Sequence, residues 1–294
     1  MISLKRILLP LTLLCAGSLA FAQGRIQEKI DTVKLWPQGA PDAFEIPGPE
    51  SGFIVFQAQR YSEALMEVYP AKQPNGICVI MCPGGAYILE SQTYEGRDLK
   101  DWFNARGITY CMLQYRLPVG HSEVPLNDVK RAISIMRERA DELGIKSVGI
   151  MGNSAGGHLA ACAATLYDSP ETRPDFQILM YPVITMEEAL TNGLSRDALL
   201  GKNPSEDLVN RFSCEKNVTP DTPPAFIVLC ADDPDVNPAN SFMYCSALIE
   251  AGVEVSMHMY PKGGHGWGWK DSMPYKDDWV AELKTWLTGI EKQL

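Results

Sequence analysis

The segment Gly152-Asn153-Ser154-Ala155-Gly156-Gly157 contains the residues whose types and spacing are best suited to chemistry. It follows an apolar run at 148–151 and precedes an alanine-rich stretch at 158–166 that is typical of a helix. A sharp turn from strand to helix requires small residues on both sides of the serine, and it exposes the hydroxyl at the end of the strand. The pattern predicts that Ser154 is a nucleophile. The alternative is a glycine-rich turn that only packs a helix onto a strand.

A general base is expected among the three histidines that follow the serine, which are His158, His258 and His265. His158 lies one helical turn after Ser154 and is expected to be structural, whereas His258 lies in an alternating run that is typical of a strand. His265 lies in a glycine-rich loop at 262–268, directly after the last expected strand. An imidazole on such a loop can reach a nucleophile at the carboxyl edge of a sheet. The sequence therefore predicts His265 as the base.

The acid that would orient this histidine lies among three aspartates, Asp232, Asp233 and Asp235, which follow the expected strand at 225–231. In a Ser-His-Asp triad the acid holds the correct imidazole tautomer and stabilises the imidazolium, so it needs a rigid position at a strand end. The order of nucleophile, acid and histidine along the chain fits this cluster. We predict Asp233 as the triad acid, with Asp235 and then Asp232 as alternatives.

Backbone N–H groups that could bind an oxyanion are expected at two places in the chain. One is Ala155, which follows the nucleophile at the start of the expected helix. The other is the loop after the expected strand at 77–82, where Gly85 and Ala86 would let the backbone approach a substrate closely. The sequence therefore predicts an oxyanion hole formed by Gly85, Ala86 and Ala155.

Two aromatic residues next to these motifs, Tyr87 and Trp267, are expected to contact the substrate. A sugar ring can stack on such side chains, and Tyr87 would form one side of the pocket. The alternative is that both side chains pack in the core or in a lid.

The elements that must position these residues follow from the hydrophobic pattern. Short runs rich in Val, Ile and Leu alternate with amphipathic stretches, which is the pattern of βα units around a parallel sheet. We expect strands at 77–82, 109–115, 147–151, 176–181, 225–231 and 254–260, and antiparallel edge strands at 53–57 and 64–69. We expect helices at 96–105, 126–143, 155–166, 238–251 and 277–290. The predicted fold class is α/β, with one domain at 23–294 and an insertion at 185–224 that caps the site.

The composition is that of a globular protein. The chain has 294 residues, of which 46% are hydrophobic and 21% charged, and this excludes collagen-like, coiled-coil and disordered classes. The formal net charge of −10 argues against a nucleic-acid partner, because phosphate binding needs a basic surface. The eight cysteines lack the close spacing of metal sites, so we expect buried thiols, at most one disulfide, no metal and no other cofactor.

The first 22 residues are expected to be a secretory signal peptide. Lys5 and Arg6 precede an apolar run at 7–22 that ends in Ala20-Phe21-Ala22. Pro10 interrupts this run, which is also short for a membrane span, so we do not expect stable membrane insertion. The predicted location is the periplasm or the exterior of the cell.

With these motifs, the chain resembles the α/β-hydrolase superfamily and, within it, the bacterial esterases grouped with feruloyl and acetylxylan esterases. The matching segments are LWPQGAP at 35–41, PGGAY at 83–87, YRL at 115–117, GNSAGGH at 152–158, LLG at 199–201 and GGHGWG at 263–268. The resemblance implies a Ser-His-Asp esterase that acts on acyl groups of plant polysaccharides. Two residues depart from the pattern of related proteins: Pro83 replaces a histidine, and Asn237 stands where a proline is frequent.

The resulting hypothesis is an exported serine esterase that hydrolyses acetyl or other small acyl esters of an acylated carbohydrate. In this hypothesis Ser154 attacks the ester, His265 transfers the proton and Asp233 orients the histidine. One alternative is a prolyl-oligopeptidase-type exopeptidase, which would prefer a dipeptidyl amide to an aryl ester. Another is a non-catalytic carbohydrate-binding protein on a hydrolase fold, which would not react with a fluorophosphonate. The sequence makes no prediction about the oligomeric state.

Overall fold

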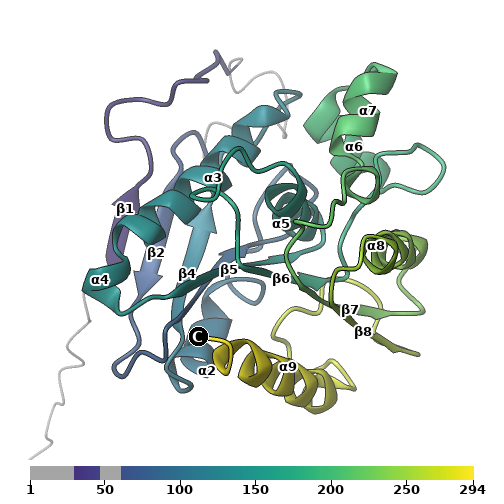
Figure 1. The fold of residues 1–294 in the computed structure, drawn as a ribbon. Coiled ribbons are helices and arrows are strands. Elements are labelled where there is room, and N and C mark those ends of the chain that lie inside the picture. The colour runs from purple at the N-terminus through teal and green to yellow at the C-terminus, as the bar shows by residue number, and fades with distance from the viewer. Residues whose placement is uncertain (1–29, 47–60) are drawn as a thin grey trace, which may run out of the picture.

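The computed structural model describes residues 30–46 and 61–294, and within them one eight-stranded sheet forms the centre of the molecule (Figure 1). The strand order is β1-β2-β4-β3-β5-β6-β7-β8. The strands are β1 (Asp31–Lys34), β2 (Leu65–Tyr69), β3 (Ile77–Cys82), β4 (Thr109–Gln114), β5 (Ser147–Asn153), β6 (Phe176–Met180), β7 (Ala225–Cys230) and β8 (Val255–Tyr260).

Strands β4, β3, β5, β6, β7 and β8 run parallel, whereas β1 and β2 add an antiparallel edge. Helices cover both faces of the parallel part, so a strand such as β3 is buried along its whole length and is apolar throughout. The six parallel strands predicted from the sequence are confirmed to within two residues at each end. The expected strand at 64–69 is β2, the one at 53–57 lies outside the described residues, and β1 was not expected.

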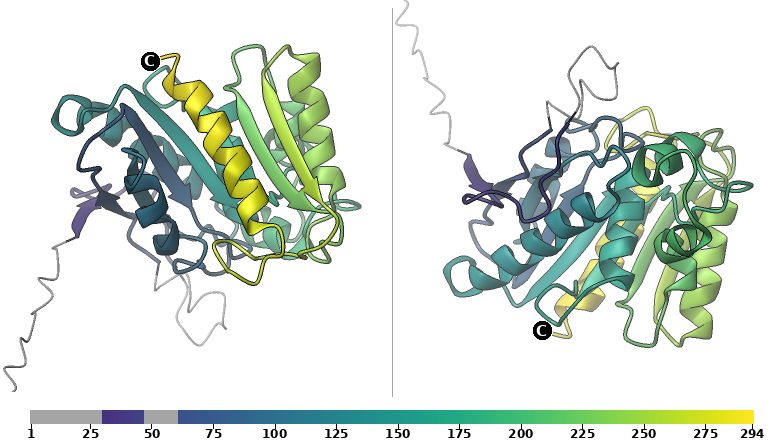
Figure 2. Two further views of the ribbon diagram at one scale, coloured as in Figure 1. Left: turned by 90° about the horizontal axis from the view of Figure 1, so that it is seen from below. Right: turned by 90° about the horizontal axis from the view of Figure 1, so that it is seen from above.

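The helices lie on both faces of the sheet (Figures 1 and 2). One face carries α2 (Lys100–Asn104), preceded by the 3-10 turn η2 (Arg97–Leu99), and α9 (Lys276–Glu291). The other carries α3 (Glu123–Glu138), α4 (Ala140–Leu143), α5 (Ala155–Thr165) and α8 (Ala239–Glu250). The single helix expected at 126–143 is divided into α3 and α4 at Arg139, whose backbone leaves the helical conformation. Within the described ranges no helix is both long and apolar enough to span a bilayer.

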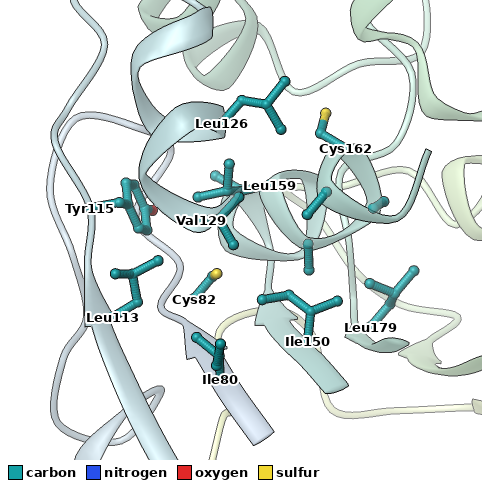
Figure 3. Packing of buried hydrophobic residues seen from close by; sticks show 14 of the residues in the cluster. Ile80, Cys82, Leu113, Tyr115, Leu126, Val129, Ile150, Leu159, Cys162 and Leu179 are labelled. Atoms are coloured by element: carbon teal, nitrogen blue, oxygen red, sulfur yellow. The ribbon is translucent and has the colours of Figure 1, made fainter. Parts of the chain in front are cut away.

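Two hydrophobic cores fix the sheet from its two faces. In the first, Leu126 of α3 and Leu159 of α5 pack above Ile80 and Ile150 of the central strands (Figure 3). In the second, α2 and α9 contribute Phe103, Trp279 and Leu283, among others. Close-packed interiors have low compressibility. The strand ends that carry the candidate site are therefore held at fixed relative positions. The cysteines in the described ranges are free thiols, and all but Cys245 are buried.

The segment at 185–224 joins β6 to β7 and contains α6 (Gly193–Leu200), α7 (Glu206–Phe212) and the 3-10 turn η3 (Cys214–Lys216). The first residues of both α-helices are capped by side chains. Asn192 accepts a hydrogen bond from the N–H of Ser195, and Ser205 accepts one from the N–H of Leu208. The segment lies beside α5 and α8, at the right of Figure 1. Its role as a cap over the site stays a prediction, as does the signal peptide, because residues 1–22 lie outside the described residues.

Candidate active site

The turn between β5 and α5 holds Ser154 in a conformation that few residues adopt, with φ 54° and ψ −120°. The two flanking glycines make this turn possible. A Cβ atom on Gly152 would lie 2.0 Å from the carbonyl oxygen of Gly156, and one on Gly156 would lie 2.1 Å from the carbonyl oxygen of Cys82. Any side chain at either position would therefore push the helix away from the strands. The turn directs the serine hydroxyl away from the sheet and toward its carboxyl edge.

Ser154, His265 and Asp233 form a continuous chain of hydrogen bonds. Nε2 of His265 lies 2.8 Å from Oγ of Ser154, and Nδ1 lies 2.7 Å from Oδ2 of Asp233. An ionised carboxylate can only accept, so Nδ1 donates to Asp233 and Nε2 is left to accept the serine proton. The side chain of Asp233 is 2% exposed and that of His265 is 13% exposed, so the imidazole reaches the solvent side while the acid is shielded. This arrangement can support nucleophilic catalysis.

The three neighbouring aspartates have different partners. Asp233 directs Oδ2 at the histidine, and its Oδ1 accepts hydrogen bonds from the N–H groups of Asp235 and Val236, each at 2.9 Å. Asp232 instead accepts a hydrogen bond from the N–H of Gly264 at 2.8 Å. Asp235 is exposed and lines the cleft described below. The structure thus brings Asp233, and neither alternative, into contact with the imidazole.

The loop after β3 lies beside the serine because β3 and β5 are neighbours in register, with Cys82 opposite Gly152. The loop reverses direction at Gly85 and Ala86, whose φ angles are 137° and 53°. A Cβ atom on Gly85 would lie 2.2 Å from the carbonyl oxygen of Leu89, so this tight reversal requires glycine.

The three expected oxyanion donors lie close to the serine. Gly85 and Ala86 line the same cleft as Ser154, and Ala155 is the first residue of α5. The N-terminus of a helix carries unpaired N–H groups and a partial positive charge, which favours a bound anion. This placement supports the predicted oxyanion hole, whose function stays a prediction.

Glu90 connects the same loop to the residue that follows β4. Its carboxyl group accepts the N–H of Tyr115 at 2.8 Å and the side-chain amide of Gln92 at 2.7 Å. Burial raises the pKa of Glu90 to about 8, although these two hydrogen bonds act in the opposite direction. The folded protein therefore keeps Glu90 protonated at neutral pH.

We expect the substitution Glu90→Gln to reduce the pH dependence of stability. Between about pH 4.5 and about pH 8 the unfolded chain releases the Glu90 proton and the folded protein retains it, so this residue lowers the free energy of unfolding as pH rises. The slope is at most about 1.4 kcal/mol per pH unit. Urea unfolding of both proteins at about pH 5 and about pH 8 measures the effect. A stability difference that stays constant with pH would contradict the prediction.

A cleft of about 300 Å³ opens at Ser154 and His265. Its lining combines apolar side chains with hydrogen-bonding ones, and it draws on five separate parts of the chain. The apolar members are Ile88, Leu89 and Leu194, and the polar ones are Ser91, Tyr94, Glu95, Asn192 and Asp235. A cleft of this kind suits a small ligand that has both apolar and hydroxyl groups.

Neither of the two expected aromatic contacts lines this cleft. Tyr87 is 1% exposed, and its hydroxyl lies 2.8 Å from Nδ1 of His158. Trp267 is 3% exposed, and its ring packs against Tyr181 and Trp279, with centroid distances of 4.6 and 5.4 Å. The expected substrate contacts do not fit these buried positions, which agree with the packing alternative.

His158 lies on the nucleophile helix α5, within a buried cluster of polar groups. Its Nε2 donates to the carbonyl of Phe212 at 2.7 Å, and its Nδ1 is paired with Tyr87. Among the described residues, His158, Cys162 and Cys214 have potential metal-ligating atoms within 4.8 Å of one another. However, Sγ of Cys162 lies 3.7 and 3.6 Å from the two ring nitrogens, so it faces the ring rather than one lone pair. The geometry fits the structural role expected of His158.

Several residues of the site do not belong to any of the motifs predicted from the sequence. Glu95 and Asn192 line the cleft from loops, and Tyr181 follows β6 and contacts the imidazole. One signal was available for Tyr181. It ends a strand at the carboxyl edge of a parallel sheet, which is where open α/β sheets bind ligands.

Comparisons with known proteins agree with this geometry. Residues 79–268 match a family described by the alpha/beta hydrolase fold. Over 237 residues the chain is 39% identical to an acetylxylan esterase of Xylanibacter ruminicola, a match that covers 78% of this chain and 48% of that protein. Over 205 residues it is 35% identical to endo-1,4-beta-xylanase B of Butyrivibrio fibrisolvens, covering 64% of this chain and 32% of that protein. The chain therefore spans about half, or less, of the length of these relatives.

Solved structures show the same relationship over nearly the whole chain. An acetyl ester-xyloside bifunctional hydrolase from Caldicellulosiruptor lactoaceticus superposes with a TM-score of 0.76 and 31% identity, covering 89% of this chain and 97% of that one. The predicted α/β-hydrolase fold and the resemblance on which it was based are confirmed. This chain belongs to the α/β-hydrolase family.

Proposed function

We propose that this chain is a serine-dependent carboxylic ester hydrolase that removes acetyl groups from xylan or a related plant polysaccharide. The observation that carries the proposal is the hydrogen-bonded series Ser154–His265–Asp233, which ends in an open cleft. The identity to an acetylxylan esterase and the structural likeness to an acetyl ester-xyloside hydrolase support the acetylated polysaccharide as substrate.

The first half of the reaction forms an acyl-enzyme. Oγ of Ser154 attacks the ester carbonyl while Nε2 of His265 accepts its proton, and the carbonyl oxygen gains a negative charge. Asp233 stabilises the imidazolium that results, because its carboxylate lies 2.7 Å from Nδ1. His265 then donates the proton to the sugar oxygen, which leaves as the alcohol while the acetyl group stays on the serine.

The second half repeats these steps with water. His265 removes a proton from a water molecule, whose oxygen attacks the acyl-enzyme carbonyl, and the proton then passes to Oγ of Ser154 as acetate leaves. In both halves the N–H groups of Ala155 and of Gly85 or Ala86 would bind the carbonyl oxygen. Donors fixed in advance stabilise the charged intermediate most, since they need not reorient during the reaction.

The volume and lining of the cleft support a substrate in which a small acyl group is esterified to a polar alcohol. Its volume of about 300 Å³ is at the lower end of the range for ligand sites, which disfavours a long hydrocarbon chain. The hydrogen-bonding groups of Ser91, Asn192 and Asp235 offer partners for sugar hydroxyls.

Acetate release from acetylated xylan tests the proposal. We expect the purified chain to release acetate and to hydrolyse an aryl acetate, with no increase in reducing ends and no cleavage of a dipeptidyl amide. The matched control, Ser154→Ala, is expected to show only background release. Serine-dependent cleavage of the aryl acetate without acetate release from xylan would keep the esterase and reject xylan. New reducing ends would contradict a pure esterase.

We further propose that the enzyme acts outside the cytoplasm. The support is the basic and apolar pattern of residues 1–22, which ends in Ala20-Phe21-Ala22. The first residue of the exported protein is expected to be Gln23 by N-terminal sequencing. Retention of Met1 in the cell fraction would contradict this proposal.

A further inference from the structure

The hydroxyl group of Tyr181 connects three segments of the candidate site. It donates to Oε1 of Glu95 at 2.7 Å, and it accepts hydrogen bonds from the N–H of Gly268 at 2.8 Å and the side-chain amide of Asn153 at 3.1 Å. Asn153 precedes the nucleophile, and Gly268 follows His265 in the same loop. One oxygen atom therefore joins the serine turn, the histidine loop and the loop that carries Glu95.

The ring of Tyr181 also contacts the imidazole. The ring centroids of Tyr181 and His265 lie 4.8 Å apart at an interplanar angle of 65°. Tyr181 is 1% exposed, and its backbone N–H donates to the carbonyl of Val228 at 2.6 Å. The tyrosine is thus held from both ends, and a shift of its hydroxyl would move the ring against which the histidine packs.

Glu95 packs directly against the histidine loop. It is 3% exposed, and a Cβ atom on Gly268 would lie 2.9 Å from its Cγ atom. The preceding residue also holds this loop, because the N–H of Trp269 donates to the carbonyl of Tyr94 at 2.7 Å. Burial raises the pKa of Glu95, against the opposing effect of the hydrogen bond from Tyr181. The carboxyl group of Glu95 can accept a hydrogen bond from the tyrosine hydroxyl whether it is ionised or protonated, because at least one of its oxygens carries no proton.

We propose that Glu95 is a positioning residue for His265 and that it acts through the hydroxyl of Tyr181. A hydroxyl has one proton and two acceptor lone pairs. When the O–H of Tyr181 donates its hydrogen bond to Glu95, both lone pairs remain to accept from Gly268 and Asn153. Without that acceptor the buried O–H is left unsatisfied, and the hydroxyl has to rotate or shift toward another acceptor, which disturbs the geometry in which it accepts from both donors. This inference rests on the proposed function, because it assigns Glu95 to the alignment of the triad.

A double-mutant cycle tests this link. The constants kcat and KM for an aryl acetate are measured in the parent chain, Glu95→Ala, Tyr181→Phe and the double variant. Each single substitution is expected to lower kcat by about tenfold to 100-fold, because a small misplacement of a catalytic group is enough for such losses. KM is expected to stay within about threefold, and the double variant to be no worse than the more severe single variant, since both substitutions remove one link.

A conservative variant and a matched control separate positioning from a general loss of structure. Glu95→Gln keeps an oxygen that can accept the hydrogen bond from the tyrosine hydroxyl. This variant is expected to retain at least about one third of the parent kcat. Glu90→Ala removes another buried carboxyl group from the same loop, one that pairs with Tyr115 and Gln92. Its effect is expected to multiply with that of Tyr181→Phe, because the two residues share no partner in this network.

Four outcomes would overturn the inference. The first is that the effects of Glu95→Ala and Tyr181→Phe on kcat multiply in the double variant, and the second is that the single substitutions change mainly KM. The third is that Glu95→Gln loses as much kcat as Glu95→Ala. The fourth is that Glu90→Ala is coupled to Tyr181→Phe as strongly as Glu95→Ala is. In each case, hydrolysis that still depends on Ser154 would leave the proposed function standing. Hydrolysis that survives Ser154→Ala would instead reject the proposed function and this inference with it.

Discussion

The substitution Ser154→Ala is expected to lower kcat for an aryl acetate by about 10⁴-fold or more. It removes the oxygen that lies 2.8 Å from Nε2 of His265, which is the atom that would form the acyl-enzyme. The fold should persist, because the alanine side chain is smaller than that of serine and fits the same space in the turn. The backbone hydrogen bonds of residue 154 also remain. Steady-state kinetics and thermal unfolding of both proteins measure the two effects.

Ser91→Ala provides a matched control for this prediction. Ser91 lines the same cleft but lies in a different loop, and its hydroxyl lies 3.5 Å from that of Tyr94 and also hydrogen-bonds Glu95. We expect this variant to keep kcat within about tenfold of the parent, because Glu95 keeps its hydrogen bond to Tyr181 and each modest hydrogen bond that is lost corresponds to about 1 kcal/mol. Equal losses in the two serine variants would show that the cleft, and not the nucleophile, accounts for the effect.

The second large effect is expected for Asp233→Asn, which should lower kcat by about 10³- to 10⁴-fold. Oδ1 of Asp233 accepts the N–H groups of Asp235 and Val236, so the amide oxygen of an asparagine side chain must occupy that position. Its NH₂ group then faces Nδ1 of His265 and forces the ring proton onto Nε2. An imidazole protonated at Nε2 cannot accept the proton of Ser154.

The neighbouring aspartates are the matched controls for this substitution. Asp232→Asn preserves an oxygen for the N–H of Gly264, and Asp235→Asn changes an exposed side chain at the edge of the cleft. Both are expected to keep kcat within about tenfold of the parent. If either control lost as much activity as Asp233→Asn, the assignment of Asp233 as the triad acid would be contradicted.

The serine turn and the histidine loop could be predicted from the sequence because their constraints are local. Gly152 and Gly156 are needed within four residues of each other, where steric conflict leaves no alternative to glycine. The parallel strands could be predicted for a similar reason, because strands buried on both faces are apolar along their whole length. The four-residue strand β1 was missed, since a short edge strand with alternating exposure has almost no hydrophobic signal.

The sequence predicted Asp233 as the acid and left Asp235 and Asp232 as alternatives, because the choice depends on the direction of one local turn. In that turn the N–H groups of Asp235 and Val236 bind Oδ1 of Asp233. The parts of the site that escaped prediction depend on contacts between distant segments. Tyr87 was expected in the pocket, but its φ of 59° and its bond to His158 place it in the interior. This bond joins residues that are 71 positions apart in the chain.

The contact between Glu95 and Tyr181 could not be predicted for the same reason. The two residues are 86 positions apart, and neither belongs to a recognisable motif. Only the packing of the loop after β3 against the end of β6 brings their side chains within hydrogen-bonding distance. Positioning residues of this kind become visible in the structure rather than in the local pattern of residues.

The most direct test of the account is labelling of the purified chain with a fluorophosphonate, followed by peptide mass mapping and an esterase assay of the same samples. We expect one label per chain on Ser154, a loss of esterase activity in proportion to labelling, and no reaction of the Ser154→Ala variant. A chain that stays fully active while Ser154 is labelled, or that is inactivated by a label on another residue, would contradict the assignment of Ser154, His265 and Asp233 as the catalytic triad.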